Sequence, residues 1–239
     1  MSARGWIVAA FLLVAVVARG AEPADPHSVP REQIQQRVRV IALMPVTVLT
    51  GAADRLTARE RFEPLLAAKL RAKGYQTVPS AEFTRVWREL SERVGGVYDP
   101  VSGRASAEKG AAVGEHTRRE MERRFGANAF LASELVLDDV VPGWNLSGEY
   151  VLWHEPILMR GRKLAGGLEG IPQRVQAAVL DVDLIDVNGA DLYHSRCGVE
   201  WIRVYAARGH EEKPPASRFQ DTAAVRNAVD KTLDPLVSR

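Results

Sequence analysis

Cysteine is almost missing from this 239-residue chain, which contains only Cys197. With a single cysteine no internal disulfide can form, even in an oxidising compartment. A reactive thiol needs exposure and a nearby positive charge. The strand pattern described below places Cys197 on an apolar face instead, so we interpret it as a small buried hydrophobic residue.

The chain also lacks an excess of one charge. Its formal net charge is +2, and the two surplus arginines, Arg4 and Arg19, both lie in the first twenty residues. The remainder carries equal numbers of basic and acidic side chains. Nucleic-acid binding needs a net basic footprint, so the composition argues against nucleic acid as a partner.

No apolar run is long enough to span a bilayer, which takes roughly twenty residues. The N-terminal run, Trp6–Val17, has about twelve, with Arg4 before it and small residues after it. This pattern predicts a secretory signal peptide over residues 1–20, with an uncleaved anchor as the alternative. No cysteine follows the run, so a lipid anchor is not evident. We expect a periplasmic or secreted protein with no membrane span after signal cleavage.

Motifs of known enzyme chemistry are missing as well. The glycine-rich run after Arg160 lacks the order of a phosphate loop, and no G-x-S-x-G elbow occurs. His154-Glu155 lacks the second histidine that a zinc-binding helix requires. The sequence therefore predicts no catalytic residue, no metal and no cofactor. One alternative stays open: an envelope hydrolase or metal-dependent enzyme using Asp138, Asp139, His154 and Glu155.

The most regular stretch that is present is Gln173–Tyr205, two strand-like runs around Asn188-Gly189. Asn-Gly favours a two-residue type I′ turn, which fixes the pairing of the two strands. One face of the hairpin is then apolar and the other carries opposite charges, and both features agree on one register. The expected pairs are Leu184–Tyr193, Leu180–Cys197 and Ala178–Val199 on the apolar face, and Asp183–His194 and Asp181–Arg196 on the other.

Periodicity elsewhere predicts strands and helices in alternation, which is typical of an α/β sheet with crossover helices. We predict a single mixed sheet with crossover helices on its faces, a C-terminal β-hairpin and a closing helix. Residues 21–36 read as a flexible N-terminal tether, and residues 37–239 as a single α/β domain with a loop-rich insert at 138–172. The expected strands are 37–48, 75–78 and 129–137, and the expected helices are 57–73, 80–94, 111–125 and 220–237.

The insert holds two of the five tryptophans, Trp144 and Trp153. Tryptophan is enriched at binding hot spots, so the insert is the predicted contact surface. The alternative is that both tryptophans hold their own loop against the sheet. The candidate partner-binding residues are Trp144, Trp153, His154, Glu155, Arg160, Arg162 and Lys163.

Several segments together resemble a family of bacterial envelope proteins. They are V-I-A-L-M-P-V in the first strand, L-R-A-K-G-Y-Q-T-V-P-S at a helix end, F-G-A-N-A-F-L-A-S-E-L, and the hairpin. Over Val38–Val237 their order is similar to that of the family that includes CsgG, LpoB and the N-terminal domain of TolB. The chain departs from it in lacking the lipid-anchor cysteine and in carrying the 138–172 insert.

The resemblance implies a non-enzymatic protein, since such proteins bind partners, activate envelope enzymes or build secretion assemblies. We therefore expect an exported periplasmic protein that binds another cell-envelope component, as an adaptor or accessory factor. A further alternative is an oligomeric subunit of a secretion or transport complex that self-associates through exposed sheet edges.

Overall fold

A computed structural model describes residues 26–48, 52–98, 106–140, 150–152, 155–157, 174–206 and 209–237. Its helices are α2 (Arg31–Arg37), α3 (Ala52–Ala72), α4 (Ser80–Arg93), α5 (Ala107–Phe125) and α6 (Thr222–Val237), with a short 3-10 turn η2 (Pro215–Ser217). Its strands are β1 (Val40–Leu43), β2 (Thr47–Val48), β3 (Gln76–Val78), β4 (Ala129–Val140), β5 (Tyr150–Leu152), β6 (Glu155–Ile157), β7 (Arg174–Asp186), β8 (Asp191–Ala206) and β9 (Gly209–Glu212). Among the described helices, none is both long enough and apolar enough to cross a membrane.

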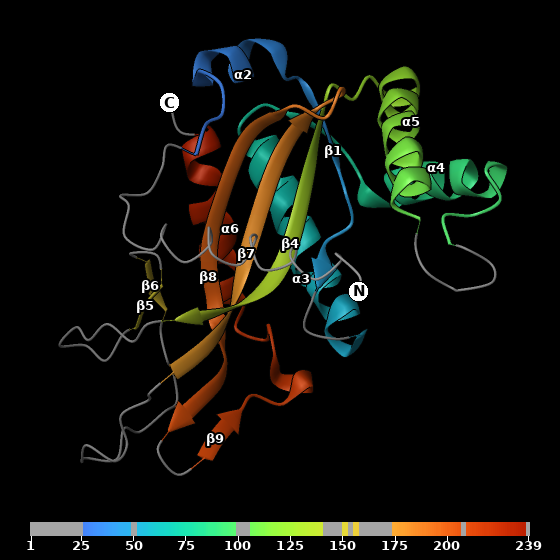
Figure 1. The fold of residues 1–239 in the computed structure, drawn as a ribbon. Coiled ribbons are helices and arrows are strands. Elements are labelled where there is room, and N and C mark those ends of the chain that lie inside the picture. The colour runs from blue at the N-terminus through green and yellow to red at the C-terminus, as the bar shows by residue number, and fades with distance from the viewer. Residues whose placement is uncertain are drawn as a thin grey trace, which may run out of the picture.

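One mixed sheet forms the centre of the molecule (Figure 1), with the strand order β3-β1-β4-β7-β8-β9 and with β2 paired to β4. Helices α3 and α6 pack on one face, and α4 and α5 pack on the other. Strands β5 and β6 pair with each other in a separate two-stranded sheet. The predicted α/β class, with its mixed sheet, hairpin and closing helix, is confirmed.

Strand β1 is central, as its continuous apolar run predicts. It pairs in parallel with both β3 and β4. Ile41 and Leu43 pack toward α3, whereas Ala42 packs toward α4 and α5, and all three are buried. A parallel strand covered on both faces needs apolar side chains in both directions, which explains the uninterrupted run.

Helix α4 begins at Ser80, as predicted, and ends at Arg93, one residue before the predicted end. Pro79 occupies its N-cap position, and no side chain caps the helix. The Ser80 hydroxyl donates to Glu63 Oε2 at 2.5 Å. Val94 lies beyond the helix and is 43% exposed.

The β7–β8 turn is wider than the two-residue turn that Asn188-Gly189 suggested. Only Gly189 has a positive φ, of 85°, and its N–H donates to the carbonyl of Asp186 at 3.0 Å. The Asp186 carboxylate also accepts the N–H groups of Asn188 and Ala190. This is the three-residue form of hairpin, in which a glycine in the left-handed region follows a tight turn.

The predicted register nevertheless holds from Val179–Gly198 to Leu184–Tyr193, because an irregularity between Leu184 and Ile185 compensates for the longer turn. The pairs Leu184–Tyr193, Leu180–Cys197, Asp183–His194 and Asp181–Arg196 are all present. Cys197 is buried, as expected.

The expected pair Ala178–Val199 is wrong. Ala178 pairs with Glu200, because the register shifts between Ala178 and Val179. A bulge inserts one extra residue into a strand and redirects the side chains beyond it. Here Val199 and Glu200 are both buried, at 5% exposure each.

From residue 26 onward, the stretch expected to be a tether over 21–36 packs against the domain. Ser28 N–H donates to the carbonyl of Leu192 at 3.1 Å, which aligns the segment with β8. Helix α2 follows, and its Ile34 is buried in the main core. The domain therefore includes residues ahead of the predicted boundary.

Glu200 connects β8 to the segment before α6. Its Oε1 accepts the N–H of Phe219 at 2.7 Å, and its Oε2 lies 2.5 Å from Lys213 Nζ. Phe219 is buried and its ring packs edge-on against Phe62. Its φ of 58° lies in the left-handed region, which costs free energy for a residue with a Cβ. The buried carboxylate thus stabilises a strained backbone.

We expect Glu200→Ala to lower the free energy of unfolding by about 2–4 kcal/mol, because it leaves a buried N–H and an ammonium without their partner. Glu200→Gln keeps an acceptor for Phe219 and should cost less. Urea denaturation would measure both, with the exposed Glu92→Ala as control. Equal stability of all three variants would contradict this role.

Candidate functional site

Strands β4, β7 and β8 gather charged side chains on one face of the sheet. Along β7, Leu180, Val182 and Leu184 are buried in the main core, whereas Asp181 and Asp183 alternate with them and point to the opposite face. We call this group the charged ladder, and its members are Glu134, Asp138, Asp181, Asp183, His194 and Arg196.

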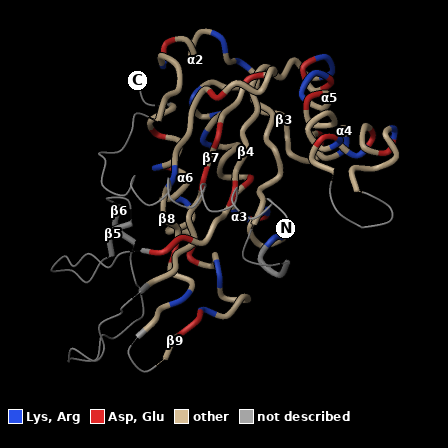
Figure 2. The backbone as a smooth tube through the Cα atoms, in the orientation of Figure 1, with Lys and Arg blue, Asp and Glu red and all other residues tan. Residues whose placement is uncertain are grey.

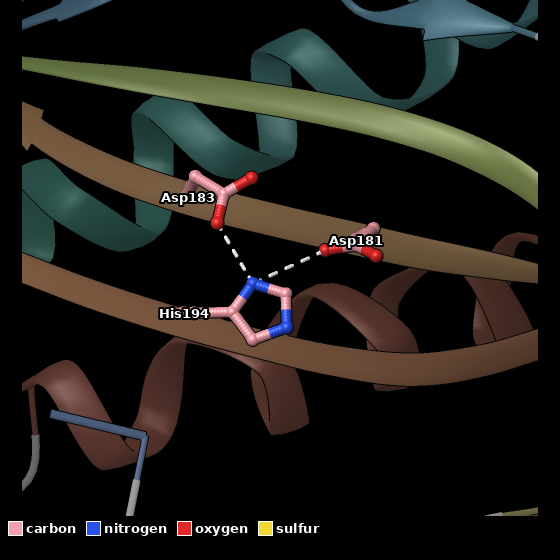
Figure 3. Close-up of side chains that lie close together, drawn as sticks. All are labelled: Asp181, Asp183 and His194. Carbon is pink, nitrogen blue, oxygen red and sulfur yellow. Dashed lines mark hydrogen bonds and ion pairs between the residues drawn. The ribbon is translucent and has the colours of Figure 1, made fainter. Parts of the chain in front are cut away.

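The imidazole of His194 lies beside two carboxylates (Figure 3). Its Nδ1 is 2.7 Å from Asp183 Oδ1 and 3.4 Å from Asp181 Oδ1. His194 is about half exposed, and Asp181 is more enclosed, with a side-chain exposure of 20%. The predicted pair Asp183–His194 is therefore present and is shared with a second acid.

Arg196 extends the charged ladder across three strands. Its Nε lies 2.8 Å from Asp181 Oδ2, and its terminal nitrogen is 3.4 Å from Asp138 Oδ2 on β4. The hairpin pattern predicts the first of these contacts. The second depends on the β4–β7 register, in which Asp138 lies opposite Ala177, and no local sequence signal reports it.

Burial raises the pKa of Asp181 above its ordinary value of 3.8. The positive charges of Arg196 and His194 act in the opposite direction, while Asp183 and Glu134 add to the rise. A carboxyl group that loses hydration on burial is harder to ionise. The charged partners of Asp181 offset only part of this free-energy cost of ionisation.

Asp181, Asp183 and His194 could also offer ligands to a cation, since one ligand atom from each lies within 4.8 Å of the others. Carboxylate and imidazole groups suit several divalent metals. However, His194 is already in contact with both carboxylates, and the Arg196 guanidinium next to Asp181 repels a cation. The geometry is that of an ion-pair ladder, in which the protein's own cations occupy the carboxylates.

The residues of the enzymatic alternative do not form a carboxylate pair. Asp138 and Asp139 are consecutive in β4, so their side chains point to opposite faces of the sheet. Asp138 contacts Arg196. His154 lies outside the described residues, and only the backbone of Glu155, in β6, is described.

Most of the candidate partner-binding residues also lie outside the described part of the chain, so their side chains stay a sequence prediction. The structure does place the two ends of their segment. Strand β4 ends at Val140 and β7 begins at Arg174, and Val140 pairs with Val175. The insert, as the structure bounds it, is therefore residues 141–173, which leave and re-enter the sheet at one end. The candidates outside the described residues are Trp144, Trp153, His154, Arg160, Arg162 and Lys163.

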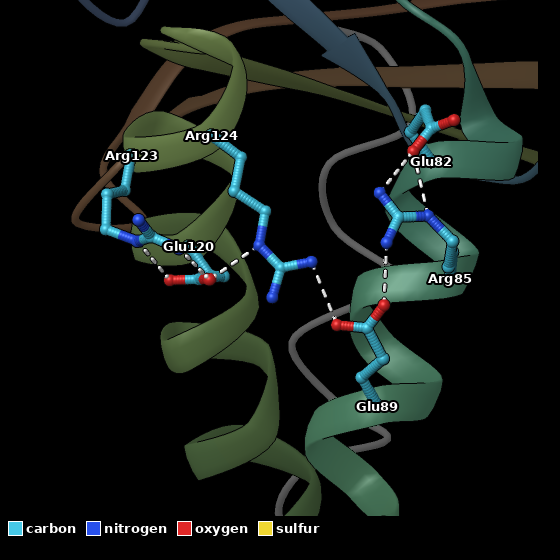
Figure 4. Close-up of polar contacts among 6 residues, drawn as sticks. All are labelled: Glu82, Arg85, Glu89, Glu120, Arg123 and Arg124. Atoms are coloured by element: carbon cyan, nitrogen blue, oxygen red, sulfur yellow. Dashed lines mark hydrogen bonds and ion pairs between the residues drawn. The ribbon is translucent and has the colours of Figure 1, made fainter.

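A second charged network joins α4 to α5 (Figure 4). Glu89 lies 2.7 Å from Arg85 of its own helix and 2.9 Å from Arg124 of α5. Glu120 receives Arg124 at 2.5 Å and Arg123 at 2.6 Å. Both signs alternate along these helices (Figure 2), which is typical of a solvated surface.

No protein-family model matches this chain, and no curated protein sequence matches it either. Among solved structures, the PelC dodecamer from Paraburkholderia phytofirmans is similar with a TM-score of 0.37 and 16% identity, over 85% of this chain and 90% of that one. Lipoprotein GNA1162 from Neisseria meningitidis has a TM-score of 0.37 and 13% identity, over 82% and 97% of the two chains. The LpoB C-terminal domain from Salmonella enterica has a TM-score of 0.32 and 13% identity, over 71% and 92%. The similar structures thus include LpoB, whereas a relation to CsgG or TolB stays a prediction.

The raised pKa of Asp181 predicts a pH effect on stability. A carboxyl that binds its proton more tightly in the folded state favours folding below its unfolded pKa, and this contribution is lost as the pH rises through the folded pKa. Relative to the parent, Asp181→Asn should therefore gain stability as the pH rises from about 3 to about 6. Urea denaturation across that range would measure the trend. A trend of the opposite sign would mean that the attraction of Arg196 outweighs burial.

Hydrogen bonds from Arg123 and Arg124 lower the pKa of Glu120 to about 2. Replacing both arginines with glutamine should move the pKa back toward 4.5, the ordinary value. Carbon-detected NMR of the Glu120 carboxyl would follow this titration. Arg119→Gln is the matched control, because Arg119 pairs with Glu115 instead. An unchanged Glu120 titration in the double variant would show that the contacts in Figure 4 do not persist in solution.

Proposed function

We propose that the protein is an exported, non-enzymatic binding protein of the bacterial cell envelope, acting as an adaptor or accessory factor. The signal-like residues 1–20 and the family resemblance over Val38–Val237 support this role. The observation that carries it is that the insert connects β4 and β7 at one end of the sheet, beyond the pair Val140–Val175.

Two connections leave the sheet at that end. The insert joins β4 to β7 beyond the pair Val140–Val175, and the β8–β9 connection lies beyond the pair Ala206–Gly209. In Figure 1 the end of β4 and strand β9 lie away from α4 and α5. All four residues of β9 are exposed. This end of the sheet therefore has exposed surface, at β9, next to the long paired strands β7 and β8.

The opposite end of the sheet is tied to a helix. There the β7–β8 turn packs against α5, and Arg118 Nε donates to the carbonyl of Val187 at 3.1 Å. Arg118 also lies close to Gly189, where a Cβ would meet its guanidinium at 3.0 Å. Partner contact at this end would have to displace α5, so the insert end is the better contact surface.

The composition of the insert fits protein contact. Tryptophans give large contact areas at binding hot spots, and basic side chains at the rim favour an acidic partner. We assign the partner contacts to Trp144, Trp153, His154, Glu155, Arg160, Arg162 and Lys163.

Self-association through β9 is a second candidate, because β9 ends the strand order and its outer edge has no paired strand among the described residues. Exposed edges pair readily with other strands. Strand β9 nevertheless carries His210, Glu211 and Glu212, and charges on an edge strand disfavour such pairing. The adaptor function is therefore the better supported of the two.

Cross-linking of the full chain in intact cells, followed by identification of the attached protein, tests the proposal. A discrete partner should appear with the parent and be lost from the double variant Trp144→Ala, Trp153→Ala, since truncating a hot-spot tryptophan costs about 2 kcal/mol or more of binding free energy. Tyr98→Ala removes an aromatic residue that is 62% exposed outside the insert, and this control should keep the partner.

The other outcomes are equally informative. A partner retained by the double variant would remove the insert from the contact surface. Products that are multiples of this chain alone would favour self-association. A bare monomer in every sample would contradict the adaptor function.

A further inference from the structure

A cavity of about 480 Å³, wide open to solvent, lies between α3, the first turns of α4 and the loop after β1. Cavities of this size accommodate small organic ligands. Pro45, which follows β1, and Ser80, which follows β3, both line it. The cavity therefore lies beyond the carboxyl ends of two parallel strands, where open α/β sheets commonly bind ligands.

The chain connections around the cavity also match those at the ligand-binding crevice of open α/β sheets. From β1 the chain crosses to β3 through α3 on one face of the sheet. From β3 it crosses back over β1 to β4 through α4 and α5 on the other face. Helices that depart to opposite faces leave a crevice between them at the strand ends.

Glu63 is the acidic residue that lines the cavity, and both of its oxygens are occupied. Its Oε1 accepts the N–H of Val46 at 3.1 Å, and its Oε2 accepts the hydroxyl of Ser80 at 2.5 Å. The carboxylate thus joins the loop after β1 to the start of α4. Its role is to hold the cavity wall in place.

Three arginines line the same cavity, and two of them have no carboxylate partner among the described residues. Arg85 is paired with Glu82 and Glu89. Arg59 donates only a long hydrogen bond, of 3.4 Å, to the carbonyl of Val46, and among the described residues Arg88 has no hydrogen bond or ion pair. The lining therefore carries more positive than negative charge: Arg59 and Arg88 have no carboxylate contact in the described part of the chain, and Glu63 is the one carboxylate that lines the cavity there.

We propose that this basic cavity, lined by Arg59, Arg85 and Arg88, binds the phosphate group of a small molecule or of a lipid headgroup. A guanidinium offers forked N–H donors that match the oxygens of a phosphate. Because no side chain caps α4, amide N–H groups of its first turn add donors beside the arginines. None of the residues that line the cavity belongs to the insert, and the site does not depend on the proposed adaptor function.

Titration of the full chain with inorganic phosphate and with glycerol 3-phosphate tests the proposal, followed by calorimetry and by the amide NMR signals of Ser80 and Ala81. Chloride at equal ionic strength is the reference. Saturable binding should weaken by about tenfold or more when Arg59→Gln and Arg88→Gln are combined, since hydrogen bonds to charged groups are the strong ones. Both side chains are on the surface, so the double variant should keep the parent's thermal unfolding curve.

Arg93→Gln is the matched control, because Arg93 is an exposed arginine of the same helix that does not line the cavity. It should leave phosphate binding unchanged. An equal loss with this control, or no saturable phosphate binding by the parent chain, would overturn the assignment.

Vesicles distinguish the two sources of phosphate. Co-sedimentation with phosphatidylcholine vesicles that contain phosphatidylglycerol, if lost in the double variant and kept by Arg93→Gln, would identify a lipid headgroup. Binding of glycerol 3-phosphate without vesicle binding would identify a soluble phosphorylated compound.

Discussion

Strands β7 and β8 pair so that Leu180, Leu184 and Cys197 meet the helices α3 and α6 on one face of the sheet. The same register turns Asp181 and Arg196 to the other face. A slip by one residue would exchange the two sets, burying charges against the helices and exposing apolar side chains. The irregularity between Leu184 and Ile185, beside the turn, preserves this alternation of buried and charged side chains. Strands β4 and β9 pair with the hairpin on either side.

The acids on the second face lie against Arg196 and His194 of the same chain, so the carboxylates of the charged ladder have partners within the sheet. His194 and Arg196 sit against the carboxylates that a metal or a reaction would need. The α4–α5 network follows the same logic, with Glu89 and Glu120 each held by arginines. Charge in these two places is matched within the fold.

The basic cavity differs, since Arg59 and Arg88 have no carboxylate contact within the described part of the chain, while the Glu63 carboxylate accepts hydrogen bonds from Val46 and Ser80. A pocket whose charges are not paired within the protein attracts ligands of the opposite charge, whereas paired surface charges do not. The insert differs again, because its importance comes from its position at the end of the sheet. The two proposals therefore assign a small-ligand site and a protein-contact surface to different parts of the chain.

By itself the sequence determined the α/β class, the central strand and four of the five expected hairpin pairs, because period-two alternation and turn chemistry are local and repeat along the chain. It did not determine the Ala178–Glu200 pair, the packing of α2, or the contact between Asp138 and Arg196. Those depend on bulges and on segments far apart in sequence, whose approach no local pattern encodes. The basic cavity belongs to the same class: its arginines come from two helices, and only the packing of those helices around the strand ends brings them to one place.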